Sequence, residues 1–168
     1  MKEEIEVKSL KILRQEFGNL KSGEEVRKYS LINNQGVTVG ILNYGGIITD
    51  ILTPGKEGSL ENIVLGFDSI SDYEEKSPYF GCIVGRIAGR ISGASFEIDG
   101  NIYNIAKNNG NSSLHGGIRG FDKVIWDVKE IVEENYVGIE LSYESPDGEE
   151  GFPGNLDVKI YYLLNNSN

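Results

Sequence analysis

The sequence is poor in the residues that build redox centres, disulfides and metal sites. Among its 168 residues there is one cysteine, Cys82, and one histidine, His115. A single thiol cannot form an internal disulfide, and no group of thiols has the spacing of metal ligands. Cys82 is therefore expected to be a small apolar residue of the core, and the sequence predicts neither a metal nor a cofactor.

Basic residues and long apolar runs are scarce as well. The 16 lysines and arginines are outnumbered by 26 aspartates and glutamates, which gives a net charge of -10. This charge disfavours nucleic acid and anionic membrane surfaces as partners. No apolar run is long enough to span a bilayer, and the first residues lack the apolar region of a signal peptide. The sequence therefore predicts a cytoplasmic protein with a neutral ligand.

Glycine, by contrast, is abundant, with 22 residues, and together with asparagine it separates short apolar segments. Such segments with turns between them predict antiparallel sheets and not βαβ units. Within the poorly determined segment 1–25, residues 5–17 have no clean period, so helix and strand are both open there. Strands are expected at residues 26–32, 37–42, 47–52, 62–67, 124–132, 137–143 and 156–164, and the strand at 124–132 is expected to be partly buried on both sides.

The clearest hairpin lies at residues 95–105. Its Asp99-Gly100 pair suits a two-residue type I′ turn, in which both residues have positive φ. Counting outward from that turn pairs Phe96 with Tyr103, and an aromatic pair at this place helps to fix the register.

The chain shows no internal repeat, linker or low-complexity tract. Residues 1–168 are therefore predicted to form one domain, an all-β sandwich of antiparallel sheets. One helical turn is expected at residues 69–73, with Asp68 or Ser69 as its N-cap.

Residues 108–121 hold the single histidine among glycines and side-chain amides. Imidazole can take or give a proton near neutral pH, so His115 is the first candidate for chemistry or ligand contact. The neighbouring glycines allow a ligand to approach the backbone closely. On composition alone, a turn residue bonded to a nearby carbonyl is the favoured alternative.

Several motifs accompany this loop in a fixed order. Residues 85–93 read GRIAGRISG, residues 114–117 read LHGG, a Gly-Phe pair at 120–121 precedes Trp126, and residues 145–154 read SPDGEEGFPG. In order and separation these motifs resemble the aldose 1-epimerase (galactose mutarotase) family, from about residue 29 to the end of the chain. The resemblance implies a galactose mutarotase-like β-sandwich. It also implies an isomerase that interconverts the α and β anomers of aldoses such as galactose and glucose by acid-base ring opening, without a cofactor.

The resemblance assigns substrate contacts to three residues. Arg90 falls on a substrate-binding arginine, whose guanidinium can direct two hydrogen bonds to neighbouring sugar oxygens. Gly89 stands where many relatives have asparagine, so it offers a sugar only its backbone. His115 falls on a histidine near the reacting end of the sugar, with a role in positioning and electrostatic support, and it is the best catalytic candidate in this chain. Arg86 competes with Arg90, and an ion pair with an acidic neighbour is an equally good interpretation of Arg86.

Other polar and aromatic candidates are expected to be structural. Carboxylates in a Pro/Gly turn are usually solvated, whereas Phe152 in the same turn should pack inward. The acids concerned are Asp147, Glu149 and Glu150. Aromatic side chains can stack on a sugar, but in a β domain they more often belong to the core. The aromatic candidates are Tyr44, Tyr79 and Trp126.

The resemblance covers only the N-terminal half of the family. The family's proton-donating histidine, its glutamate base and a sugar-binding aspartate follow the segment that matches the end of this chain, so the chain alone is expected to be weak or inactive. A sandwich cut in this way exposes strand edges and an apolar face. Self-association or a complementary C-terminal polypeptide is therefore expected, with residues 160–164 as the most adhesive edge. A non-catalytic carbohydrate-binding domain and a structural β module are the alternative functions.

Overall fold

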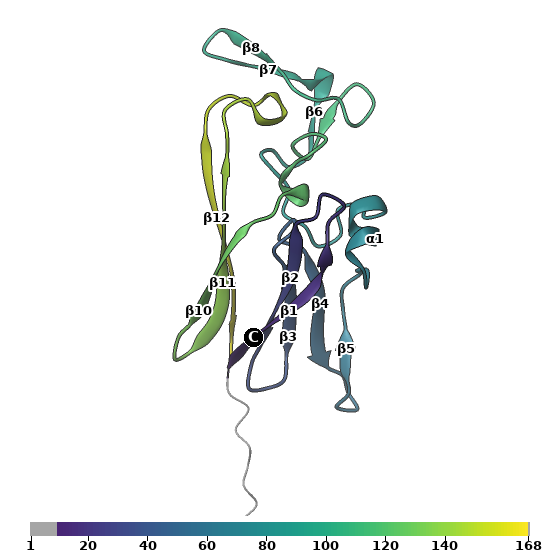
Figure 1. Ribbon diagram of the computed structural model, residues 1–168, viewed down its shortest axis with the longest axis vertical. Coiled ribbons are helices and arrows are strands. Elements are labelled where there is room, and N and C mark those ends of the chain that lie inside the picture. Colours follow the sequence, from purple (N-terminus) through teal and green to yellow (C-terminus); the bar gives the residue numbers. More distant parts are fainter. Residues whose placement is uncertain (1–9, 168) are drawn as a thin grey trace, which may run out of the picture.

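The computed structural model describes residues 10–167, which form two layers of antiparallel strands (Figure 1). One layer is a five-stranded sheet in the order β1-β2-β3-β4-β5, and the other is a three-stranded sheet in the order β10-β11-β12. The predicted sandwich of antiparallel sheets is confirmed. The strands of the first sheet are β1 (Lys11–Asn19), β2 (Glu25–Ile32), β3 (Thr38–Leu42), β4 (Ile48–Pro54) and β5 (Leu60–Asn62). Those of the second are β10 (Asp127–Val132), β11 (Tyr136–Ser145) and β12 (Leu156–Asn165).

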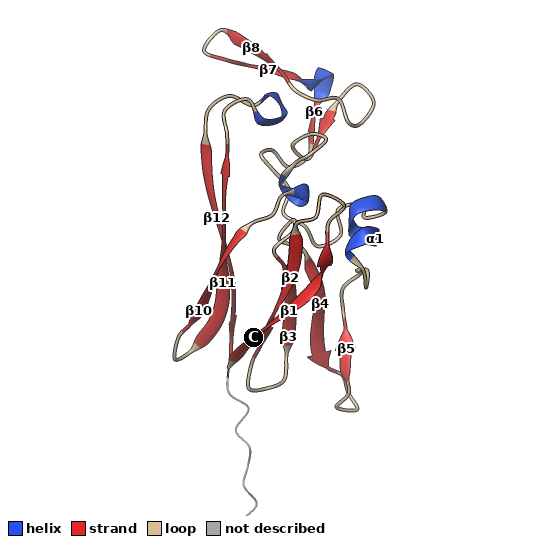
Figure 2. Cartoon of the chain, in the orientation of Figure 1, coloured by secondary structure: helices blue, strands red, loops and turns tan. Residues whose placement is uncertain are grey.

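A further region lies at one end of the two layers, at the top of Figure 1. It contains two short strand pairs, β6 (Arg90–Ile91) with β9 (Ser113–Leu114), and β7 (Ser95–Ile98) with β8 (Asn101–Asn104). The described helices are short, as Figure 2 shows. They are α1 (Ile70–Glu75) and three 3-10 turns, η1 (Ser92–Ala94), η2 (Phe121–Lys123) and η3 (Glu149–Gly151).

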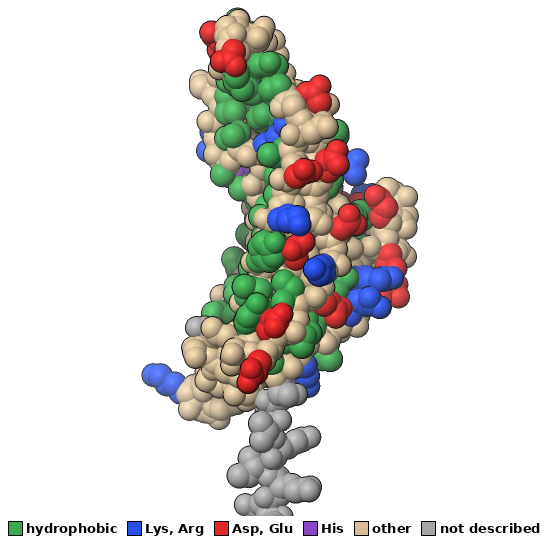
Figure 3. Space-filling view, turned by 90° about the vertical axis from the view of Figure 1, so that its left-hand side faces the viewer, with side chains coloured by type: hydrophobic (Ala, Val, Ile, Leu, Met, Phe, Trp, Pro, Cys, Tyr) green, Lys and Arg blue, Asp and Glu red, His purple; other side chains and the backbone are tan. Residues whose placement is uncertain are grey.

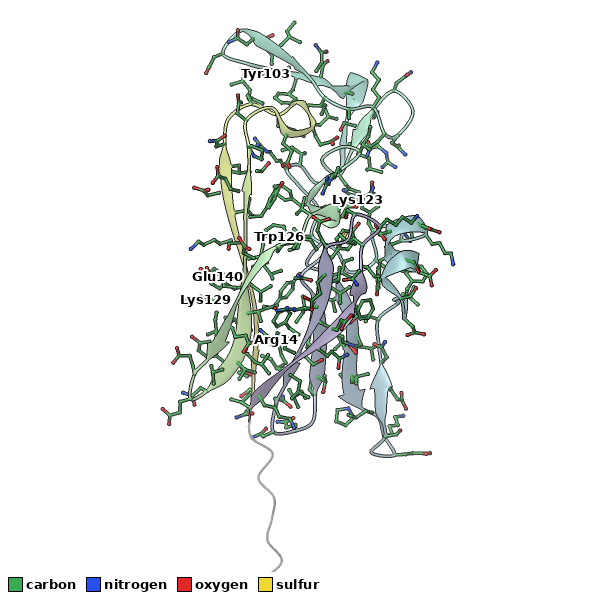
Figure 4. All side chains as sticks on the ribbon, in the orientation of Figure 1. Arg14, Tyr103, Lys123, Trp126, Lys129 and Glu140 are labelled. Carbon is green, nitrogen blue, oxygen red and sulfur yellow. The ribbon has the colours of Figure 1, made fainter. Side chains whose placement is uncertain are left out.

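The main core lies between the two sheets. Ile41 from β3 and Ile139 and Leu141 from β11 are fully buried there. Trp126, only 1% exposed, lies between the layers (Figure 4) and donates its indole N–H to a backbone carbonyl. A strand turns successive side chains to opposite faces, so β11 buries its apolar residues and leaves Glu140 on the outer face.

The predicted hairpin and helix cap are confirmed. β7 and β8 pair Phe96 with Tyr103, and the two rings stack with centroids 5.6 Å apart. The turn residues Asp99 and Gly100 have φ of 51° and 77°, as type I′ geometry requires. Ser69 caps helix α1 by accepting a hydrogen bond from a backbone N–H of the first turn.

The strand predicted at residues 62–67 is wrong. β5 ends at Asn62, and the chain beyond it faces solvent, with Ile63 64% exposed. The Asn62 side chain explains this end, because its Oδ1 accepts the backbone N–H groups of Ile51 and Val64. A side chain that takes over backbone hydrogen bonds competes with further strand pairing.

One other segment differs in part from the sequence prediction, and in a second segment the structure decides between two open alternatives. Of the strand predicted at residues 124–132, only the part from Asp127 pairs in the sheet. Its half-buried residues, Val128 and Ile131, lie on opposite faces, so the expected partial burial on both sides is confirmed for this part. Residues 124–126 instead connect the layers, since the Trp126 N–H donates to the carbonyl of Asn43. In the N-terminal segment, residues 11–19 form the strand β1, and residues 1–9 lie outside the described part.

β12 is an edge strand of the second sheet. It pairs with β11 and with no other strand of residues 10–167, and Tyr161 and Leu163 are 52% and 55% exposed. Figure 3, which looks at this side of the molecule, shows hydrophobic side chains gathered over its lower half and again near the top. The predicted edge at residues 160–164 is therefore open, and its adhesion to another chain stays a prediction.

Asn33 joins the two sheets at the end away from the short strand pairs. The residue is fully buried in the turn between β2 and β3. Its Oδ1 accepts the backbone N–H groups of Gln35 and Val37, and its Nδ2 donates to the carbonyl of Asn165 in β12 at 3.0 Å. One amide thus closes a turn and fastens it to the opposite layer.

Asn33→Ala is expected to lower the free energy of unfolding by roughly 2 kcal/mol, because these hydrogen bonds are lost and buried backbone groups stay unpaired. The exposed neighbour Asn34 is hydrogen-bonded through its backbone N–H, so Asn34→Ala should cost less than about 0.5 kcal/mol. Urea denaturation measures both. Equal losses in the two variants would contradict the role of Asn33.

Candidate functional site

The three predicted contact residues, Gly89, Arg90 and His115, lie together. β6 and β9 run antiparallel and place Arg90 opposite Leu114. Gly89 therefore comes beside His115, although the two are 26 residues apart in sequence. The site stands where this short ladder stops, in the region at the top of Figure 1.

Gly89 and His115 exchange two hydrogen bonds. The His115 backbone N–H donates to the Gly89 carbonyl at 3.0 Å, and the Gly89 N–H donates to His115 Nδ1 at 3.1 Å. An imidazole nitrogen that accepts a hydrogen bond carries no proton, so neutral His115 has its proton on Nε2. Within residues 10–167, Nε2 has no hydrogen-bond partner. The alternative of a turn residue bonded to a nearby carbonyl holds for the backbone, because His115 lies in a turn and its N–H donates to Gly89, whereas its side chain accepts from a backbone N–H.

The glycines after His115 are a steric requirement. φ is 52° at His115, 93° at Gly116 and 117° at Gly117. A side chain at Gly116 would overlap the carbonyl oxygen of Gly85. Only glycine accepts both this conformation and this close approach, so the His-Gly-Gly sequence lets the loop turn tightly behind the imidazole.

Two asparagines outside the predicted contact residues hold the site. Asn108 donates to the carbonyls of Leu114 and Gly117 and accepts from the Leu114 N–H at 2.6 Å. Asn109 accepts a hydrogen bond from Arg90 Nε at 2.9 Å. The two terminal nitrogens of Arg90 have no hydrogen-bond partner in the described part of the chain. Asn109 therefore orients a guanidinium that keeps donors for a ligand.

Tyr79 borders the imidazole. The rings of Tyr79 and His115 meet edge to face with centroids 4.8 Å apart. Burial raises the pKa of the Tyr79 hydroxyl, which stays protonated at neutral pH. Tyr44 and Trp126, 5% and 1% exposed, are core residues as predicted. Tyr79 departs from that prediction, because it is only half-buried and lies at the site.

Arg86 is a brace between segments. Its Nε donates to Ser145 Oγ at 2.8 Å, and its terminal nitrogens donate to the carbonyls of Ser145, Pro146 and Pro153 at distances of 2.8 to 3.0 Å. None of the acidic residues in the described range forms an ion pair with it. The ion-pair interpretation of Arg86 is wrong, and its donors are already occupied by protein acceptors.

Two acids of the 145–154 turn are both half-buried and hydrogen-bonded within the protein, so the prediction that they are solvated is wrong for them. Glu149 accepts from the hydroxyl groups of Tyr143 and Ser145. Glu150 accepts from two backbone N–H groups of the loop after His115, at 2.7 and 3.1 Å. Glu150 therefore ties the turn to that loop.

The rest of the 145–154 turn agrees with the prediction. Asp147 is exposed, and Phe152 is 5% exposed and stacks on Phe96 with centroids 5.7 Å apart. Phe152 also lines an apolar trough of about 470 Å³ below the β7–β8 hairpin. The other apolar residues of this trough are Ile87, Ile91, Phe96, Ile98, Pro153 and Leu156.

Asp122 lies buried in η2, just after the His115 loop. Its side chain is 10% exposed, and its Oδ2 lies 3.9 Å from Lys123 Nζ. In the described range its Oδ1 and Ser113 Oγ are the buried side-chain oxygens without a hydrogen-bond partner. Burial raises the pKa of Asp122, and the charge of Lys123 opposes that shift. The carboxyl lines a cavity of about 150 Å³ together with Tyr79 and Cys82.

The structure offers no cluster suited to a metal within residues 10–167, where no group of three or more His, Cys, Asp or Glu side chains is placed to hold an ion. Cys82 is half-buried and packs against a hydrophobic cluster that includes Tyr44, Ile47 and Tyr73, and burial raises its pKa to about 12. In the same range no helix has the length and apolar character to cross a membrane.

Comparison with known proteins supports the motif-based resemblance. Residues 27–168 match the aldose 1-epimerase family. The chain is 45% identical to galactose mutarotase of Sus scrofa over 154 residues. This match covers 91% of this chain and 44% of that protein. The chain is 36% identical over 159 residues to aldose 1-epimerase of Streptococcus thermophilus, covering 95% and 45%. The crystal structure of galactose 1-epimerase from Lactobacillus acidophilus matches with a TM-score of 0.83 and 31% identity, covering 95% of this chain and 46% of that one.

The two-layer antiparallel fold and the order of its motifs define an all-β protein of the galactose mutarotase type. The chain belongs to the aldose 1-epimerase family. It spans less than half the length of the relatives named above. The matched residues include Gly89, Arg90 and His115.

Arg86→Lys is expected to lower the free energy of unfolding by about 2–4 kcal/mol, because a lysine cannot reach the four acceptors that the guanidinium fork joins. Arg90→Lys, at an exposed side chain with one hydrogen bond, should cost less than about 1 kcal/mol. Guanidinium denaturation compares the two variants. A loss at Arg90 as large as that at Arg86 would show that the roles are assigned wrongly.

Asp122→Asn is expected to raise the free energy of unfolding at neutral pH by about 1–3 kcal/mol, because the amide has no charge to bury. A carboxyl whose pKa is raised on folding stabilises the fold below its unfolded pKa and loses this contribution as pH rises through the folded pKa. The difference in free energy of unfolding between Asp122→Asn and the wild type should therefore vanish below about pH 3.9. Unfolding of both proteins at acidic and neutral pH tests this, and a variant that is less stable at neutral pH contradicts it.

Proposed function

We propose that this chain carries the sugar-positioning part of an aldose 1-epimerase that interconverts the α and β anomers of aldoses such as galactose and glucose. The supporting observation is the pair of hydrogen bonds between Gly89 and His115, which leaves Nε2–H as a donor, together with the terminal nitrogens that Arg90 keeps on the same short strand pair. The ring oxygen and hydroxyl oxygens of a sugar are acceptors, so a site made of donors suits it.

The reaction needs a proton at the ring oxygen and loss of a proton from the C1 hydroxyl. The ring opens, the aldehyde turns its other face, and the ring closes. His115 would donate from Nε2 to an oxygen near the reacting end and stabilise negative charge that develops there. Arg90 would hold neighbouring hydroxyls through its two terminal nitrogens. Gly89 contributes by fixing His115 and not by touching the sugar.

The acid and the base that complete this chemistry are proposed to come from outside the chain. By resemblance, the family's proton-donating histidine and glutamate base follow the segment that matches the end of this sequence, and His115 matches a different position. We propose that the family's remaining length pairs with the open edge of β12 and covers the apolar trough, where Ile98 and Leu156 are 47% and 40% exposed. Self-association along the same edge is the other form of this proposal.

Two alternative functions differ in what the site would do. A non-catalytic carbohydrate-binding domain would bind sugar through Arg90 and His115 without turnover, and a structural β module would bind none. The donors of these two residues favour sugar contact over a structural role, because Gly89 and Asn109 hold both side chains in one orientation while their remaining N–H groups bind no part of residues 10–167. A cytoplasmic location and a single-domain organisation stay predictions from the sequence.

The test is polarimetry of freshly dissolved α-D-galactose and α-D-glucose. The chain alone should match the buffer rate, and adding a polypeptide that comprises the uncovered part of the Sus scrofa galactose mutarotase should accelerate the decay. In that mixture His115→Ala and Arg90→Ala should each reduce the acceleration by about 10²-fold or more. Lys129→Ala, on the second sheet away from the site (Figure 4), is the control and should change nothing.

Two outcomes would decide against this function. Sugar binding without acceleration, although the two polypeptides associate, would favour the non-catalytic domain. An active mixture that tolerates both alanine variants would show that His115 and Arg90 do not serve the reaction.

A further inference from the structure

Asp122 occupies a place that packing alone does not explain. The residue is 9% exposed and lies in η2, between the His115 loop and the core tryptophan. Its Oδ1 is closed off from solvent and lacks a hydrogen-bond partner among residues 10–167. A buried carboxylate oxygen without a partner is costly, and such groups in native proteins call for a specific role.

Oδ1 lies with two backbone carbonyls around Gly120. A methyl group on Gly120 would be 2.7 Å from the His115 oxygen, 2.9 Å from the Gly85 oxygen and 3.1 Å from Asp122 Oδ1. The Gly85 carbonyl accepts from the Phe121 N–H at 3.3 Å, whereas the His115 carbonyl has no partner in the described residues. Three acceptors converge on one glycine, and Asp122 is the group among them that can carry a proton.

We propose that Asp122 is a positioning residue for His115: in its protonated form the carboxyl donates from Oδ1 to the His115 carbonyl and so fixes the turn behind the imidazole. The proton comes from solvent, and no other bond changes. The His115 N–H is already held by Gly89, so this proton fastens the other side of the same residue. An ionised Asp122 would repel the carbonyls and loosen the hydrogen bond from Gly89 to Nδ1.

The groups around Asp122 act on its pKa in both directions. Burial is the main cause of its raised pKa, and Glu150 acts in the same direction, whereas Lys123, a hydrogen bond from the Asp122 backbone and His115 oppose it. Lys123 lies 3.9 Å from Oδ2 and also donates to the Ile118 carbonyl at 2.9 Å. The other titratable groups that face the carboxyl are Tyr44, Tyr79 and Cys82; burial raises the pKa of each, so they are uncharged at neutral pH.

The inference rests on the proposed function for its meaning, but its test needs no sugar and no turnover. His115 is the only histidine of the sequence, so in an untagged chain its imidazole ¹⁵N and ¹H resonances are unambiguous. In the wild type these resonances should follow two ionisations, one of them coinciding with the carboxyl ¹³C titration of Asp122. Asp122→Asn, which keeps a donor, should abolish that transition and retain the Nε2–H tautomer.

Asp122→Ala should lose both the transition and the single tautomer, because no donor then faces the His115 carbonyl. Asp127→Asn removes an exposed carboxylate a few residues further along the chain and is the matched control, which should behave as the wild type. The proposal is overturned if Asp122 titrates together with the exposed carboxylates, or if the wild type and Asp122→Asn give the same His115 curves. These two results decide the matter even where Asp122→Ala does not fold.

Discussion

Two hydrogen bonds between Gly89 and His115 hold the candidate site in one geometry. They fix the imidazole ring and its tautomer at the end of the strand pair that carries Arg90. A hydrogen bond of this kind contributes only about 1 kcal/mol, and the β6–β9 ladder next to it has two residues in each strand. The pair can persist only because the segments on both sides are anchored elsewhere.

The anchors are side chains that cross from one loop to another. Arg86 binds the segment before Gly89 to the 145–154 turn, Glu150 binds that turn to the loop after His115, and Asn108 closes the histidine loop itself. The turn stands on the ends of β11 and β12, whose position depends on the core between the sheets. The sandwich therefore supports the turn rigidly, and the hydrogen bonds between the turn and the loops hold the donors of His115 and Arg90 in fixed orientations.

Local signals predicted the parts of this structure that depend on neighbouring residues. The Asp99-Gly100 turn, the Ser69 cap and the alternation of β11 are of this kind. The roles of Arg86 and Glu150 were not predictable, because their partners are 59 to 67 and 31 to 32 residues away and include backbone groups that no side-chain pattern reveals. The strand expected at residues 62–67 does not form beyond Asn62, because the Asn62 side chain accepts backbone hydrogen bonds there. The apolar composition of the segment does not reveal this competition.

The central claim is that this chain holds sugar donors already aimed before a sugar arrives. The most direct measurement is an NMR titration of the ¹⁵N-labelled chain with galactose, followed at His115 Nε2 and at the Arg90 side chain, with the open-chain polyol sorbitol as the control. We predict that both signals shift together and saturate with galactose, while the amides of β10 stay unchanged. A folded chain in which neither signal shows a saturable change would contradict the claim.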